Sequence, residues 1–186
     1  MSYYTVRGII RSSLPILIIT SFIGLFAGQM LNIHLDELVA LPTILLLIPA
    51  LIKIGGDTGS MLAARLSSAF HMGLGTTHIH KNPVVRNSVA AALIIGTSAS
   101  IFLSAAIWFV AGMTNSPLSL LDLFKICTIA GFLEQIAVFS ATIAIAFASH
   151  RFGLDPDDTV IPMIATLGDV VGIAAIFATL YLFGII

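Results

Sequence analysis

Long apolar runs alternate with short polar segments along the chain, and each run is continuous rather than alternating residue by residue. A helix needs about 20 apolar residues to cross a membrane, whereas a transmembrane strand shows about 10 residues of alternating polarity. The pattern therefore predicts an all-α integral membrane protein with five transmembrane helices. The predicted spans are residues 14–33, 38–70, 88–112, 118–149 and 159–186.

The second span is long and contains a segment that is poor in helix formers. As one straight helix, residues 38–70 would extend about 50 Å, more than the roughly 30 Å of the hydrocarbon core. Glycines surround Asp57 in residues 55–59, and glycine is unfavourable inside helices. We therefore expect a break or a strong tilt here. Asp57 would then cap the helix that resumes, or Gly55 and Gly59 would form a packing face.

Basic residues predict the orientation in the membrane, because Lys and Arg prefer the cytoplasmic side. Residues 34–37 and 113–117, which connect spans, contain neither Lys nor Arg. With five alternating spans, the remaining basic regions fall on one side. The sequence thus predicts a cytoplasmic N-terminus and an external C-terminus. The residues that carry this prediction are Arg7, Arg11, Arg65, Lys81, Arg86 and Arg151.

Composition agrees with the pattern and excludes several classes of protein. Of 186 residues, 58% are hydrophobic and 9% are charged, whereas soluble domains have roughly 45–50% and about 25%. The net charge of -1 gives no basic surface for nucleic acid. A single cysteine, Cys127, excludes a disulfide framework and a Cys-rich metal site. The length fits one transmembrane domain over residues 1–186.

Three acids, Asp57, Glu134 and Asp169, lie inside the predicted spans. A charge at the centre of the bilayer costs roughly 2.5–3.5 kcal/mol on insertion scales, so each acid is a candidate functional residue. The fifth span contains no Lys, Arg or His. Asp169 must therefore meet a cation, a proton or a group on another helix, and a protonated structural carboxyl stays open as an alternative.

Small and polar residues accompany Asp169. Ala165, Gly168 and Gly172 share a helix face with it and allow another backbone to approach closely. Thr166 offers a hydroxyl group, and Pro162 frees a backbone carbonyl.

Glu134 lies in the middle of the fourth span. We expect it to be a third ligand, a proton carrier, or the partner of Lys53 or Arg65. Toward the outer end of the first span, Asn32 is a candidate for lining an entrance, and Gly24 and Gly28 are expected to be packing contacts.

Two polar groups lie near the predicted cytoplasmic side. Asp155, Asp157 and Asp158 would attract divalent cations or favour the start of the next helix. The histidines His71, His78 and His80 are expected to belong to a solvated loop rather than a metal site.

The intramembrane donors are carboxylates, hydroxyls, amides and backbone carbonyls, without Cys or His. Oxygen donors suit hard cations such as Mg²⁺, Ca²⁺ and Mn²⁺. Mg²⁺ keeps several waters beside one or two carboxylates, which fits sparse acids in a wide polar path.

Two sequence runs resemble a known family, the MgtE and solute carrier family 41 magnesium transporters. The run LIPALIKIGGDTGSMLAARLSS (residues 47–68) is similar to the second-helix signature of that family. The runs DPDD (155–158) and PMIATLGD (162–169) are similar to its fifth-helix signature. The resemblance extends over essentially the whole chain, and its specific motifs are confined to these two spans.

The resemblance implies a homodimer with Mg²⁺ as the leading substrate and no cofactor. We expect the protein to lie in the cell membrane of a prokaryote. Asp169 takes the position of the pore-lining acid that binds largely hydrated Mg²⁺. The predicted ion path lies between subunits and is lined by the second and fifth helices. Its residues would be Asp169, Asp57, Ala165, Thr166 and Gly56, with Glu134, Asp158 and Asn32 as secondary candidates.

Two departures from the family pattern affect the mechanism. About a dozen residues precede the first span, where bacterial members have a magnesium-sensing CBS region. We therefore expect gating by that sensor to be absent or supplied by another polypeptide. Asp57 stands where the family commonly has Asn, which leaves a channel and an exchanger coupled to Na⁺ or H⁺ both open.

An enzyme is the remaining alternative. Asp57, Gly59 and Arg65 faintly resemble the aspartate-rich motif of CDP-alcohol phosphotransferases. That chemistry needs two more aspartates on the next helix, and no acid occurs between Asp57 and Asp122. We therefore expect a transporter and not an enzyme.

Overall fold

The computed structural model describes residues 5–74, 82–113 and 118–186. All of its regular structure in these residues is helical, and five helices are long and apolar enough to cross a membrane. The all-α, five-span architecture is thereby confirmed. The helices are α1 (Val6–Ile33), α2 (Leu35–Ala40), α3 (Pro42–His71), α4 (Pro83–Gly112), α5 (Leu120–Arg151) and α6 (Pro156–Leu182).

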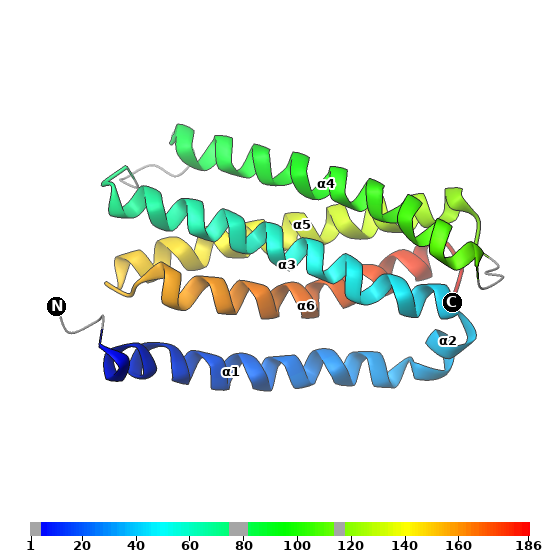
Figure 1. Cartoon of the computed structure of the whole chain (residues 1–186), viewed down its shortest axis with the longest axis horizontal. Helices are drawn as coiled ribbons and strands as arrows, with labels where there is room; N and C mark the ends of the chain where they lie inside the picture. The colour runs from blue at the N-terminus through cyan, green and yellow to red at the C-terminus, as the bar shows by residue number, and fades with distance from the viewer. Residues whose placement is uncertain (1–4, 75–81, 114–117) are drawn as a thin grey trace.

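The long helices form an antiparallel bundle in which α3 and α6 lie at the centre (Figure 1). These two helices have the most extensive contact in the described chain, and they run in opposite directions. Helix α3 also packs against α4 and α5, while α6 also packs against α1 and α5. Helix α1 has its main contact with α6 and is the least buried of the five.

Most helix starts have a recognisable N-cap, which explains why they differ from the predicted spans. The side chain of Thr5 accepts a hydrogen bond from the backbone of Gly8, so α1 begins at Val6 rather than near residue 14. Apolarity alone marks the part of a helix inside the bilayer and misses the polar turns beyond it. The other side-chain caps are Asn82, Ser119 and Asp155.

The second predicted span is divided elsewhere than expected. A short helix, α2, precedes Leu41, and Pro42 occupies the first turn of α3. Proline restricts the residue before it and suits the first turn of a helix. Of the two expectations for residues 55–59, the break is wrong, because α3 is continuous from Pro42 to His71, and the tilt stays a prediction. Asp57 consequently lies inside a helix and is not an N-cap.

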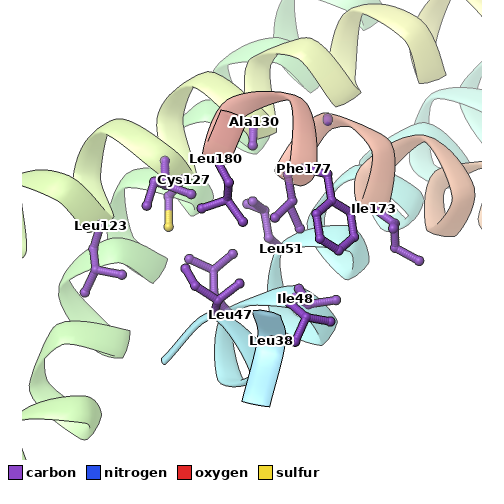
Figure 2. Packing of buried hydrophobic residues seen from close by; sticks show 14 of the residues in the cluster. Leu38, Leu47, Ile48, Leu51, Leu123, Cys127, Ala130, Ile173, Phe177 and Leu180 are labelled. Carbon is purple, nitrogen blue, oxygen red and sulfur yellow. The ribbon is translucent and has the colours of Figure 1, made fainter. Parts of the chain in front are cut away.

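Two hydrophobic clusters fill the bundle, one toward each membrane side. The first contains Leu47, Leu51, Ile176 and other residues from α1 to α6, and Figure 2 shows its packing around Leu180. The second lies toward the other end of the bundle. Its fully buried side chains come from α3, α5 and α6 and are Leu62, Leu66, Val138, Ala146, Val160 and Ile164.

The residues between these clusters form a distinct layer. We call this the central layer: residues 52–61 of α3, 93–106 of α4, 131–137 of α5 and 165–172 of α6. The polar and glycine positions of this layer that are discussed below are Lys53, Gly55, Gly56, Asp57, Gly59, Gly96, Glu134, Gln135, Thr166, Gly168, Asp169 and Gly172.

Candidate ion-binding site

The three intramembrane acids all lie in the central layer, close to the midpoints of their helices. Asp57 is on α3, Glu134 on α5 and Asp169 on α6. The fold therefore brings together at one depth the residues that the sequence marked as costly to place in a membrane. Their environments differ, since Asp57 is exposed, Asp169 is half-buried and Glu134 is buried.

Helices α3 and α6 touch backbone to backbone beside these acids. A Cβ atom on Gly168 would lie 2.7 Å from the Cα atom of Gly56, and one on Gly56 would lie 3.3 Å from the carbonyl oxygen of Ala165. Glycine at position 168 is thus required for the observed contact, and a Cβ atom at position 56 would be tight against the backbone of α6. The predicted role of the small residues before Asp169, which was to admit another backbone, is confirmed.

This contact places Gly56 and Ala165, two of the predicted ion-path residues, against each other. Gly56 directly precedes Asp57, and Ala165 lies one helical turn before Asp169. Thr166 lies in the same turn of α6, and its hydroxyl donates a hydrogen bond to the carbonyl of Pro162 at 3.1 Å. The Thr166 oxygen still has acceptor capacity, because a hydroxyl can donate and accept together.

Asp57 forms an ion pair with Lys53 one turn earlier on α3. The Nζ atom of Lys53 lies 2.7 Å from Oδ1 of Asp57, and the two side chains are 69% and 57% exposed. Lys53 was expected to be a possible partner of Glu134, and the structure gives it a different one. Sequence reasoning missed this pair, although opposite charges four residues apart on a helix were the signal for it.

Asp169 faces the same region from α6. It is half-buried, and its carboxylate and the Lys53 ammonium group are close enough to act on each other electrostatically. One cation and two carboxylates of the same protomer therefore share a polar patch in the middle of two membrane-spanning helices. We call Lys53, Asp57 and Asp169 the charged patch.

Glu134 lies behind this patch, between α3 and α6. Its side chain is 1% exposed, and Oε1 has no hydrogen-bond partner within the described residues. A Cβ atom on Gly55 would overlap the Glu134 carboxyl group, and one on Gly172 would lie 2.8 Å from Oε1. The two glycines thus form the space that holds this carboxyl group. The predicted pairing of Glu134 with Lys53 or Arg65 is not found in the described part of the chain.

Gln135 occupies a similar space against α4. It is fully buried, and a Cβ atom on Gly96 would lie 2.7–2.9 Å from its amide group. Its Oε1 and Nε2 atoms have no hydrogen-bond partner within the described residues. Sequence reasoning missed this residue, and its position beside Glu134 in a mid-span segment was the available signal.

The secondary candidates Asp158 and Asn32 are not part of the charged patch. Asp158 is in the first turn of α6 and accepts a hydrogen bond from the Ser12 hydroxyl of α1 at 3.0 Å. Eleven residues of helix separate it from Asp169, about 16 Å along the axis. Asn32 lines a largely apolar groove between α1 and α3 at the other end of the bundle.

At the end of the bundle that holds Asp158, Asp155 caps α6 by accepting a hydrogen bond from the backbone of Asp157 at 3.0 Å. His71 lies beside it, with Nε2 3.7 Å from Oδ1 of Asp155. These three exposed side chains have the spacing of metal ligands. His78 and His80, which the sequence groups with His71, lie outside the described residues.

Gly24 and Gly28 of α1 do not have the packing role predicted for them. A Cβ atom on either would meet nothing within 4 Å in the described chain. Helix α1 touches the bundle chiefly through α6 and leaves these glycines on its open surface.

The comparisons with known proteins agree on one family. The family model of MgtE, described as a divalent cation transporter, matches residues 48–179, from α3 through α6. The curated relatives include solute carrier family 41 member 2 of Xenopus laevis, 26% identical over 154 residues, which are 80% of this chain and 27% of that protein. Member 3 of Mus musculus is 23% identical over 151 residues, 78% of this chain and 31% of that protein.

Member 3 of Rattus norvegicus is 24% identical over 165 residues, 86% of this chain and 35% of that protein. The chain thus spans about a third of the length of the curated relatives that it matches. The matched region contains the complete central layer, the fifth-helix signature and all but the first residue of the second-helix run. The family is one of transporters and not of enzymes. This chain therefore belongs to the MgtE family of divalent cation transporters, as a membrane domain shared with solute carrier family 41.

Proposed function

We propose that two copies of this chain form a path for divalent cations, Mg²⁺ first, with the charged patches of both copies facing each other. The observation that carries the proposal is the exposure of Lys53 and Asp57 at the middle of α3. Charged groups at this depth are expensive against lipid and normally face a water-filled cavity or a partner. A two-fold dimer covers such a patch with its own copy.

The ligand chemistry of the central layer supports a hard cation. Its residues include neither Cys nor His, so oxygen atoms supply its charged and polar donors, apart from the nitrogen atoms of Lys53 and Gln135. Carboxylate, carbonyl and water ligands suit Mg²⁺, and Mg²⁺ keeps part of its water shell. In this proposal Asp169 and Asp57 hold the hydrated ion, and the carbonyls of Gly56 and Ala165 with the Thr166 hydroxyl contact its waters.

The proposed orientation follows from the arrangement of the helix ends. The start of α1, the end of α3, the start of α4 and the end of α5 lie at one end of the bundle in Figure 1. The arginines that flank these helices are Arg7, Arg11, Arg86 and Arg151. By the preference of basic residues for the cytoplasm, this end would be cytoplasmic in a cell membrane, and the end of α6 would be external.

Flux into liposomes that contain the purified protein and a Mg²⁺-sensitive dye tests the proposal. Asp169→Asn keeps the size of the side chain and removes its charge, so we expect Mg²⁺ flux to fall to background in a folded protein. Asp122→Asn is the matched control, because Asp122 lies near the start of α5, where it bonds to Ser119, outside the central layer. Wild-type flux in the Asp169→Asn protein would overturn the proposal.

A coupled exchanger is the second candidate, and buried Glu134 favours it. A carboxyl group that lacks a partner in the described chain and adjoins the charged patch is suited to carrying a proton. The same liposomes, measured with and without Na⁺ and pH gradients, separate the two functions. In an exchanger, Mg²⁺ movement requires counter-movement of the coupling ion and responds to its gradient, whereas a channel transports Mg²⁺ along its own gradient alone.

A further inference from the structure

The charged patch contains a cation where an ion path for Mg²⁺ requires anions. In the central layer, which the structure describes completely, Lys53 is the one Lys or Arg residue. Its ammonium group pairs with Asp57 at 2.7 Å and acts electrostatically on Asp169. A basic residue at this place needs an explanation, because it repels the ion that the path is proposed to carry.

Helix stability does not explain the pair. Lys53 precedes Asp57 by four residues, which is the less favourable order of such a pair along a helix. Both side chains belong to α3 and are mostly exposed, so the pair itself is a contact within one helix. Exposed ion pairs of this kind contribute little to the stability of a fold in water.

Packing does not explain the presence of Lys53 either. Its side chain is 69% exposed and lies on the exposed stripe of α3 that also includes Met61. The position of Lys53 is therefore best understood through its charge. Its flexible four-carbon stem lets the ammonium group move between nearby carboxylates.

The charges of the patch indicate the role of Lys53. The two carboxylates and one ammonium group of the charged patch sum to a single net negative charge per protomer, with the buried carboxyl group of Glu134 behind it counted as neutral. Two protomers then carry two negative charges, which is the charge that one divalent cation neutralises. Without Lys53 the same path would carry four.

We propose, on the basis of the proposed ion path, that Lys53 is a tethered cation that sets the charge of the path to match one divalent ion. The ammonium group holds Asp57 between passages of ions and moves aside when an ion reaches the carboxylates. The ammonium group returns as the ion leaves, and its positive charge weakens the binding of the ion to the carboxylates. Conduction needs binding that is favourable enough for entry and weak enough for release.

Lys53→Met tests this role, since methionine is unbranched and uncharged. In Mg²⁺ flux into liposomes, we expect the apparent KM to fall on the order of tenfold, because removing a charge a few ångströms from the ion changes its binding by about this much. The maximal rate should fall as well, because the ion is released more slowly. Lys53→Arg keeps the charge and should stay closer to wild type in both quantities.

A second variant separates the charge from other effects of the substitution. Adding Asp57→Asn to Lys53→Met removes the excess negative charge, so the KM should rise again by several-fold. Lys125→Met is the control, because Lys125 lies near the ring of Phe183 at an outer helix end. Should the Lys53→Met protein not fold, Lys53→Gln carries the same expectation.

An unchanged KM and maximal rate in Lys53→Met would overturn the role of Lys53, and so would equal losses in Lys53→Met and Lys53→Arg. The Asp169→Asn protein distinguishes this failure from failure of the proposed function. If Asp169→Asn stops flux while Lys53→Met leaves it unchanged, the ion path stands and only the tethered cation is wrong.

Discussion

At the scale of single residues, the glycines of the central layer leave space that neighbouring side chains occupy. Gly55 and Gly172 leave space for the Glu134 carboxyl group, and Gly96 leaves space for the Gln135 amide. Glycine at these three positions thus makes room for two polar side chains in the middle of the bundle. Such an arrangement favours a role of Glu134 in transport over a merely tolerated polar residue.

A substitution at Gly55 tests this fit. Gly55→Ala places a Cβ atom onto the Glu134 carboxyl group, and overpacking of a filled interior costs about 1–3 kcal/mol. We expect a lower unfolding temperature for purified Gly55→Ala protein in detergent. Adding Glu134→Ala should recover part of the loss, whereas Glu134→Gln, of equal size, should not. A similar unfolding temperature for Gly55→Ala and wild type would show that Glu134 is not held there.

At the scale of the elements, the contact between α3 and α6 positions the two aspartates. Gly56 and Gly168 bring the two backbones together, and Asp57 and Asp169 each follow one of these glycines directly. The separation of the helices therefore sets the separation of the two carboxylates. A change in this contact should alter transport without touching either acid.

Gly168→Ala is the direct test, because its Cβ atom would lie 2.7 Å from a backbone atom, which cannot move aside as a side chain can. We expect both the unfolding temperature and Mg²⁺ flux to fall. Gly28→Ala is the matched control in a helix interior, since its Cβ atom would meet nothing within 4 Å. Alanine there should stabilise α1 by about 0.5–1 kcal/mol, if it changes stability at all. Equal behaviour of the two variants would refute the role of the contact.

The elements also show which features were predictable from sequence. Apolar length predicted all five spans, because the bilayer requires a fixed number of apolar residues. The continuity of α3 was not predictable from glycine content. Gly59, for instance, packs against Val138 and Ile164, so tertiary contacts outweigh its low helix propensity. A broken helix in lipid would also leave backbone groups without partners.

The candidate site was predictable in its acids and not in its geometry. Asp57, Glu134 and Asp169 were identified because a charge inside an apolar span is costly. The sequence does not indicate which way Glu134 and Asp169 face, because α5 and α6 are nearly uniformly apolar around their circumference. Asn32 was included for its polarity and Asp158 for its place in the acidic DPDD run, and only the fold shows that neither belongs to the charged patch.

At the scale of the whole molecule, the outward direction of the charged patch predicts where a second copy binds. Met61 lies one turn beyond Asp57 on the same exposed stripe of α3. After replacement of buried Cys127 by Ala, Met61→Cys should form a disulfide-linked dimer in membranes under mild oxidation. Phe102→Cys, on α4 and more exposed than Met61, is the control. Cross-linking through position 102 and not through position 61 would place the dimer interface elsewhere.

The ion pair on α3 also has a consequence for how the protein is made. Helix α3 has the lowest hydropathy of the five candidate spans, and it is synthesised before α5 and α6, the helices that later pack against it. While the chain emerges from the ribosome, Lys53 and Asp57 have mainly each other as partners, four residues apart in one segment. Their mutual neutralisation reduces the cost of moving this helix into lipid. The same two side chains that are proposed to balance the charge of a passing ion would thus first assist the insertion of α3 during biogenesis.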